Sequence, residues 1–348
     1  MNMFKMRLDG WFWFALLVAP FVSWALRAQA LWSQGHLGYF GLAKEAVWGT
    51  AVAATDYAEL FSENLATTID RFTTKNIFAS FNEPDDFAGA RRSAGGIVLP
   101  AHPVSLGHAL KAIFNNMSGS TITSGFLYNT VFTGTKSEFA DGVPRQPYTL
   151  EVFRDVTSAH RYIGAVANRL QLALAPNQTL QATIEWIAKS RALIARTTPT
   201  FPGSPIDAFA FDTASVQLVG AATAKLEGFT LTIDNQLEGI LALNNSNEIA
   251  RIRSTGLQMI NISGTLDFSN VDEEQDFINQ TERAMVINLT RASSFNLLIE
   301  IPRMVYTAYS VGMAGRGRIA ATFEGKGRYL TSSAAAIMMR LTTTKSNY

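Results

Sequence analysis

The sequence predicts a mainly β protein, built as a β-sandwich or barrel with one short flanking helix in each of two tandem domains. Short runs of alternating apolar and polar residues recur along the chain, which is the pattern of half-buried strands. The length of 348 residues exceeds the usual size of one domain. Hydrophobic residues make up 47% of the chain and charged residues only 16%, which is low for a soluble monomer. We therefore expect much of the surface to be buried against further copies of the chain.

The first domain is expected at residues 33–196. It begins with a loop-rich N-terminal arm that runs to about Asn82. A strand at 91–99 precedes Val104–Phe114, where apolar residues recur at helical spacing. Residues 115–146 are rich in Ser, Thr, Gly and Asn, which suits a long loop or an extended hairpin, and a loop of that length is usually functional. Further strands are expected at 148–154, 162–175 and 180–187.

The second domain is expected at residues 214–348, after a linker at 197–213. The segment Thr197–Pro205 within this linker contains three prolines and one glycine, a composition typical of domain boundaries. The rest of the chain again alternates with a period of two. Strands are expected at 216–219, 225–234, 258–268, 285–289, 295–301, 318–324 and 336–341.

A short helix is also expected in the second half, at Asp272–Gln280, because acidic residues favour a helix N-terminus. Both halves then share one order: a strand, a short helix and several antiparallel strands. That order runs over residues 91–186 and again over 258–341, and it indicates an internal duplication although the sequence identity between the halves is weak. The apolar side chains expected to face inward from the second helix are Val271, Phe277 and Ile278.

The charge balance and the absence of cysteine exclude several function classes. The 29 basic and 28 acidic residues give a formal net charge of +1, and no long run of one sign announces a nucleic-acid surface. The chain contains no cysteine, which excludes thiol catalysis, disulfides and cysteine-ligated metal sites. We expect no specific binding of nucleic acid.

No motif in the sequence predicts a catalytic, cofactor-binding or metal site. The usual phosphate-loop, hydrolase, zincin and EF-hand spacings do not occur. His102 and His108 straddle a strand-to-helix turn and are interpreted as surface or turn residues, and Glu83–Asp86 as a polar turn rather than a cation site. The glycines of Gly312–Arg318 precede a strand, so a flexible connection is favoured over a phosphate cradle. A basic patch, which could be a solvated face or could meet acidic groups of a neighbouring subunit, comprises Arg316, Arg318, Lys326 and Arg328.

Residues 1–32 differ in character from the rest. Lys5 and Arg7 precede the apolar run Trp11–Leu26, and the small residues Ala28 and Ala30 follow it, as in a secretory signal. The alternative is a start codon assigned too far upstream. The first interpretation supports a second function, that of a secreted or membrane-tethered β-rich binding or surface protein.

One stretch resembles the opening of siphophage tail tube proteins. Leu37–Leu65 contains a glycine, a run of small residues and Trp48-Gly-Thr50, followed by Thr55-Asp-Tyr57 and a segment that ends near Ser62-Glu63. The resemblance extends over residues 37 to 343 through short motifs. These motifs are Arg91–Pro100, Tyr148–Leu150, Gly228–Asn235 and Ser263–Phe268.

The resemblance implies a structural virion protein that polymerises into stacked rings, which form the hollow phage tail tube through which DNA is ejected. It implies no enzymatic activity and no cofactor. The partners would be the chain itself, as a homotrimeric pseudo-hexameric ring or a homohexamer, together with tape-measure and tail-terminator proteins. Assembly would take place in the host cytoplasm. The N-terminal arm and residues 115–146 would be candidates for ring-to-ring contacts.

Overall fold

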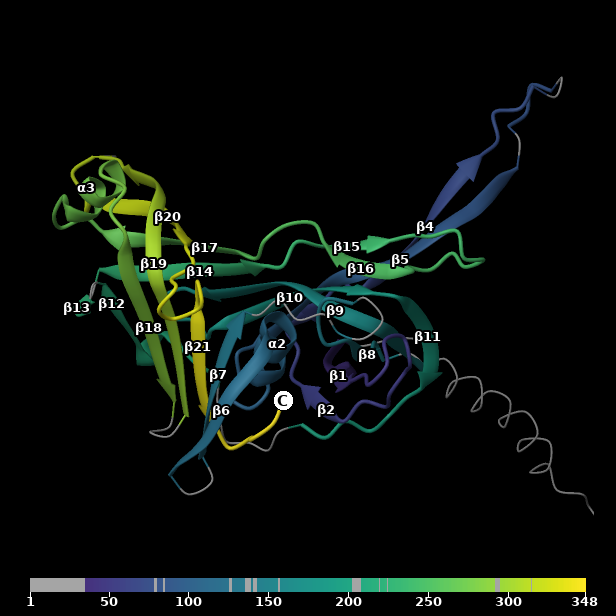
Figure 1. Ribbon diagram of the computed structural model, residues 1–348, viewed down its shortest axis with the longest axis horizontal. Coiled ribbons are helices and arrows are strands. Elements are labelled where there is room, and N and C mark those ends of the chain that lie inside the picture. The colour runs from purple at the N-terminus through teal and green to yellow at the C-terminus, as the bar shows by residue number, and fades with distance from the viewer. Residues whose placement is uncertain are drawn as a thin grey trace, which may run out of the picture.

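The fold is mainly β, as the sequence predicts (Figure 1). The computed structural model describes residues 35–348 except 78–79, 84, 125–126, 135–138, 140–142, 156, 202–207, 219, 224, 292–294 and 314, and no side chains over 120–127. Two hairpins project from the body in opposite directions, β4–β5 at one end and β6–β7 at the other (Figure 1).

The elements of the first half follow the predicted order of a strand, a helix and further strands. They are η1 (Gly35–Leu37), β1 (Tyr39–Lys44), β2 (Asp56–Ala58), β3 (Ser62–Glu63), β4 (Ala66–Thr73), β5 (Asp86–Pro100), α2 (Leu106–Phe114), β6 (Asn115–Ser124), β7 (Leu127–Gly134), β8 (Tyr148–Phe153), β9 (Ser158–Leu174), β10 (Gln181–Ala188) and β11 (Ser190–Ala195).

The second half repeats that order without a counterpart of β6 and β7. Its elements are η3 (Phe211–Thr213), β12 (Ala214–Leu218), β13 (Ala221–Thr223), β14 (Leu226–Asp234), β15 (Leu237–Ile240), β16 (Arg251–Ser254), β17 (Met259–Asp267), α3 (Asp272–Ile278), β18 (Arg283–Arg291), β19 (Phe295–Val311), β20 (Ala320–Gly327) and β21 (Met338–Thr343).

The two halves also share one pattern of strand pairing. In the first half the antiparallel order is β4-β5-β10-β9, and in the second half it is β14-β17-β20-β19. The halves are joined because β9 pairs with β14. The eight strands β4-β5-β10-β9-β14-β17-β20-β19 thus form one continuous sheet, which we call the eight-stranded sheet.

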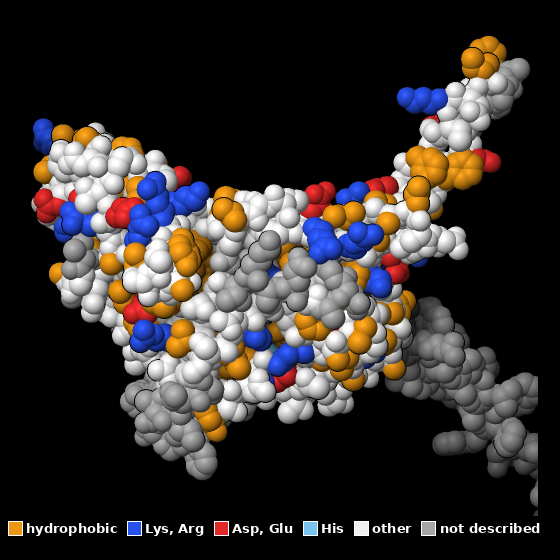
Figure 2. Space-filling view, in the orientation of Figure 1, with side chains coloured by type: hydrophobic (Ala, Val, Ile, Leu, Met, Phe, Trp, Pro, Cys, Tyr) orange, Lys and Arg blue, Asp and Glu red, His pale blue; other side chains and the backbone are white. Residues whose placement is uncertain are grey.

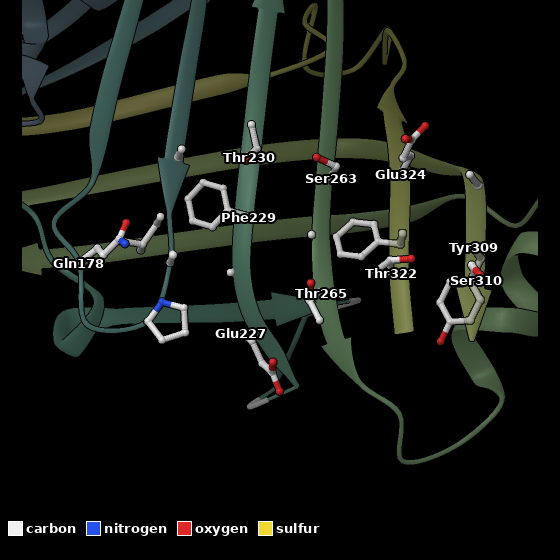
Figure 3. Close-up of a pocket in the computed structure, with 18 of the residues that line it drawn as sticks. Gln178, Glu227, Phe229, Thr230, Ser263, Thr265, Tyr309, Ser310, Thr322 and Glu324 are labelled. Carbon is white, nitrogen blue, oxygen red and sulfur yellow. The ribbon is translucent and has the colours of Figure 1, made fainter. Parts of the chain in front are cut away.

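The strands β9 and β19 each span 17 residues and pass from one layer to the other. The first part of β9 pairs with β8 and β11, and its second part pairs with β10 and β14. The first part of β19 likewise pairs with β18 and β21, and its second part with β20. Figure 3 shows strands of the second layer crossing behind the eight-stranded sheet. Apolar side chains of both layers and α2 form one core that extends through both halves.

The helix α2 is enclosed by this core. All of its residues except Lys111 are buried, and it ends where Asn115 adopts a left-handed conformation with φ 62°. The C-terminal tail closes over the start of the helix, because a Cβ added at Gly107 would lie 2.2 Å from the ring of Tyr348. Only glycine leaves room for this contact.

The structure corrects four expectations. Residues 115–134 form the hairpin β6–β7, so the extended-hairpin alternative is right there and the long loop is wrong. The segment after Gly38 is more than an arm, since β1 is a buried strand paired with β8. In α3, Val271 and Ile278 are 52% and 59% exposed, because this short helix buries Asp276 and packs only Phe277 against the core.

The fourth correction concerns residues 197–213. The described end of this segment is integrated into the fold, since Phe209 is fully buried and donates its N–H to the carbonyl of Ala101. Its carbonyl in turn accepts the N–H of Leu180 at 2.7 Å. The proline-rich composition therefore marks a connection that packs on the first half.

Candidate assembly surface

One face of the eight-stranded sheet packs on the core, and the other is open. Strict alternation in β10 and β20 buries every second side chain and leaves the rest on the open face. The open face is hollowed over β9, β14, β17, β20 and β19 (Figure 3). Hydroxyl and amide side chains dominate it, including Gln171, Gln181, Thr183, Thr230, Thr232, Asn261, Ser263, Thr265, Ser310 and Thr322.

Arginines on and beside this face are neutralised by carboxylates of the same chain. Arg169 lies 3.6 Å from Glu185 on the neighbouring strand, and Arg92 lies 3.4 Å from Asp70. A third pair joins Arg318 to Glu227. A surface that binds nucleic acid offers cations to phosphates, whereas these arginines already have acidic partners.

The sheet has two long unpaired edges. In the described part of the chain, β4 pairs only with β5, and residues 305–311 of β19 pair only with β20. Such edges expose backbone N–H and C=O groups that can pair with another chain. Both edges border the polar open face.

The β4–β5 hairpin carries exposed apolar side chains (Figure 2). Phe72 and Phe87 are 57% and 49% exposed, and their rings stack with centroids 5.6 Å apart. Ile69 on the same hairpin is 47% exposed. Exposed apolar groups on a protruding element are typical of interaction surfaces.

A buried carboxylate explains the Trp-Gly-Thr motif. The carboxyl group of Glu45 accepts the N–H of Gly49 at 2.8 Å, the N–H of Gly164 at 2.7 Å and the hydroxyl of Thr149 at 2.7 Å. Trp48 donates its indole N–H to the carbonyl of Gly164 at 3.0 Å. Gly164 has φ +66°, and a Cβ there would lie 2.7 Å from the indole nitrogen. The motif therefore shapes the fold around Glu45.

A second, partly buried cluster fixes the C-terminal tail. The ammonium of Lys345 contacts Asp56 and lies 2.9 Å from Nε2 of His108. The same imidazole nitrogen lies 3.4 Å from Asp56, so the three side chains form one polar cluster. Burial lowers the pKa of His108, and the contacts with His108 and Lys345 hold the pKa of Asp56 well below its usual range.

This cluster makes stability depend on pH. Because the folded pKa of His108 lies below 6.5, the unfolded chain binds a proton first as the pH falls. Stability is therefore expected to decrease from pH 7 to pH 5, by up to about 1.4 kcal/mol per pH unit. Chemical denaturation should show a smaller dependence for His108→Gln, with the exposed His36→Gln as control. An unchanged slope in H108Q would contradict this role.

The sequence candidates for chemistry do not form a reaction centre. His102 accepts the N–H of Val104. His108 is buried within α2 and belongs to the tail cluster, so its interpretation as a surface or turn residue was wrong. Asp86 pairs with Arg71 at 2.7 Å. Within the described ranges, no group of three or more His, Cys, Asp or Glu could hold a metal ion.

Two of the four residues of the basic patch are paired with carboxylates of the same chain. Arg318 contacts Glu227, and Arg328 lies 3.6 Å from Glu282. The acidic residues of the hollow, Glu227 and Glu324, have no histidine beside them among its lining residues. These positions therefore offer charge pairs and polar surface.

Residues 1–32, with their signal-like pattern, lie outside the described residues. Within the part of the chain that the structure does describe, no helix is long and apolar enough to cross a membrane.

The fold and its surface define a mainly β structural protein with two free sheet edges and a polar concave face. A family model described as phage tail tube protein matches the chain over residues 35–327. The chain thus belongs to the phage tail tube protein family, whose role is structural, and it is a component of the virion tail. Among curated proteins, no sequence matches the chain.

Proposed function

We propose that copies of the chain assemble into closed rings, which stack into the hollow tail tube. The observation that supports this proposal is the strand pairing that joins the two halves of one chain, which we call the internal junction. β9 of the first half pairs with β14 of the second from Leu174↔Phe229 to Arg169↔Asp234. The strands in the corresponding places, β19 and β4, have free edges in the described part of the chain. A contact between two different edges can repeat from copy to copy and close into a ring.

The repeated pairing pattern supports two tandem tail-tube-like domains, at residues 33–196 and 214–348. Each domain contributes four strands to the eight-stranded sheet, so three copies supply six equivalent positions. A homotrimeric pseudo-hexameric ring follows from this arrangement. A homohexamer is the alternative. The trimer is favoured because both four-stranded units of one chain already lie side by side in one sheet.

The open face of the sheet would line the channel. Its hydroxyl and amide side chains, and the pairing of its arginines with carboxylates, support passage of DNA without specific binding. No histidine lies beside its acidic residues among the lining residues, which supports a purely structural function. The assembled tube would serve DNA ejection.

Other contacts follow from the same arrangement. The β6–β7 hairpin occurs once per chain and, with the N-terminal arm that runs from about Gly38 to Asn82, is our candidate for ring-to-ring contact. Tape-measure and tail-terminator proteins would contact the channel and the end of the tube, and assembly would take place in the host cytoplasm.

Negative-stain electron microscopy of the full chain at rising concentration tests the proposal. We expect rings at low concentration and hollow tubes at high concentration, because edge pairing depends on mass action. A monodisperse monomer at all concentrations would contradict assembly through free edges.

A further inference from the structure

Irregularities in the two long strands align the halves residue by residue. In β9 the register against β10 shifts between Trp186↔Ala167 and Glu185↔Arg169. In β19 the register against β20 shifts between Gly325↔Tyr306 and Glu324↔Ala308. Both shifts leave one extra residue in the long strand, so Ala308 takes the place of Arg169. Counting two residues onward, Ser310 takes the place of Gln171.

The other edge aligns through the same ladder. Ala66 pairs with Ala94, which pairs with Ile187 of β10. In the second half, Thr232 pairs with Asn261, which pairs with Lys326 of β20. The register shifts make Glu185 of β10 equivalent to Glu324 of β20. Ile187 and Lys326 each lie two residues after these glutamates, so they are equivalent to each other. Ala66 therefore takes the place of Thr232.

Inside the chain, Gln171 pairs with Thr232. We propose that the same junction forms between copies, with Ser310 of one copy opposite Ala66 of the next. The side chains of Val311 and Leu65 would face each other beside this pair, while the backbone N–H of Leu65 stays bonded to Glu63 and its carbonyl to Arg154 and Tyr162. This proposal rests on the proposed function and specifies its register.

In the proposed register, the residues placed opposite each other on β19 and β4 point to the same face of the sheet. Leu65 is buried and Val311 packs against the core, as Leu172 and Leu231 do at the internal junction. Ser310 and Ala66 are exposed. A slip of one residue would bring core-facing side chains opposite open-face side chains. The burial pattern therefore excludes such a slip, and the alignment of the two halves gives the register among those that remain.

The same alignment of the two halves places the exposed Ile69 of one copy against the exposed Ile278 of another. Asn235 follows β14 and donates its side-chain N–H to the carbonyl of Ile113, near the end of α2, at 3.0 Å. Ile69 takes the place of Asn235, one residue beyond the pair Thr68↔Arg92. Ile69 of the next copy would therefore meet the end of α3 in the first copy. There Ile278 is 59% exposed, and Ile69 is 47% exposed, so both would lose exposed area in the ring.

Engineered cysteines test the register, since the chain has no cysteine of its own. The double variant Ala66→Cys with Ser310→Cys should form disulfides between copies upon mild oxidation of assembled protein, because directly opposite residues lie within disulfide reach. Non-reducing denaturing gels should then show covalent dimers and trimers. The matched control, Thr67→Cys with Ser310→Cys, places the thiols on opposite faces and should yield at most about a tenth as much.

The outcomes separate the two proposals. Rings by microscopy without A66C–S310C cross-links, or with stronger T67C–S310C cross-links, would overturn the register and leave the ring intact. Protein that forms no rings would overturn the proposed function.

The hairpin contact has its own test. Ile69→Asp and Ile278→Asp should each raise the concentration needed for rings about tenfold. The double variant should raise that concentration by less than the product of the two single effects, since both substitutions remove the same contact. Unchanged assembly in both single variants, with an unchanged monomer spectrum by circular dichroism, would overturn this docking.

Discussion

The double variant Ala66→Glu with Ser310→Glu is expected to lower ring formation by about two orders of magnitude. Like charges directly opposite each other in a strand pair cost up to about 1 kcal/mol, and a closed trimer contains three such junctions. The sum of about 3 kcal/mol corresponds to roughly a 100-fold change in the assembly equilibrium. Sedimentation velocity across a concentration series would measure it.

A charge swap provides the matched control for this variant. Ala66→Lys with Ser310→Glu should assemble nearly as well as the natural chain, because opposite charges then face each other across the junction. Both positions are exposed in the single chain, so thermal unfolding of the monomeric species should be unchanged in either variant. Equal loss of assembly in both double variants would exclude direct opposition of the two residues.

The substitution Glu45→Ala is expected to destabilise the first half by at least about 3 kcal/mol. Gly49, Gly164 and Thr149 would each lose a hydrogen-bond acceptor in a buried site, at about 1–3 kcal/mol for each unsatisfied donor. That loss is a large share of the about 5–15 kcal/mol that stabilises a typical domain. Urea unfolding followed by tryptophan fluorescence would measure it.

Two variants make this measurement specific. Glu45→Gln keeps an acceptor oxygen and should cost less than Glu45→Ala, whereas the exposed Glu59→Ala should change the free energy of unfolding by less than about 0.5 kcal/mol. A cost for E45A no larger than that for E59A would contradict the structural role of the Glu45 carboxylate.

Local pattern was sufficient to predict much of the fold. The strands β10, β14 and β17 follow from alternation because one face of each is buried and the other is not. The strand β8 was also predicted, but all six of its residues are buried. The helix α2 follows from its apolar spacing. The Trp-Gly-Thr motif indicated the family without revealing its physical cause, which lies in the distant Thr149 and Gly164 that bond Glu45.

The assembly surface could not be predicted from local pattern. The free edges of β4 and β19 exist only because of which strands pair elsewhere, and pairing is a long-range property. The hairpin β15–β16 was missed because its strands are four residues each. Val271 and Ile278 were expected to face inward because an apolar residue beside a helix usually packs on its own core. In this chain both are exposed, and we propose a partner copy for Ile278.

The mass of the isolated ring tests the central claim most directly. If the two halves of one chain occupy adjacent positions in the ring, mass photometry of the smallest closed ring should find three chains of 38.0 kDa each. Image averages of that ring should then show six similar positions around the channel. A smallest ring of six chains would contradict the claim that each chain supplies two of the six positions.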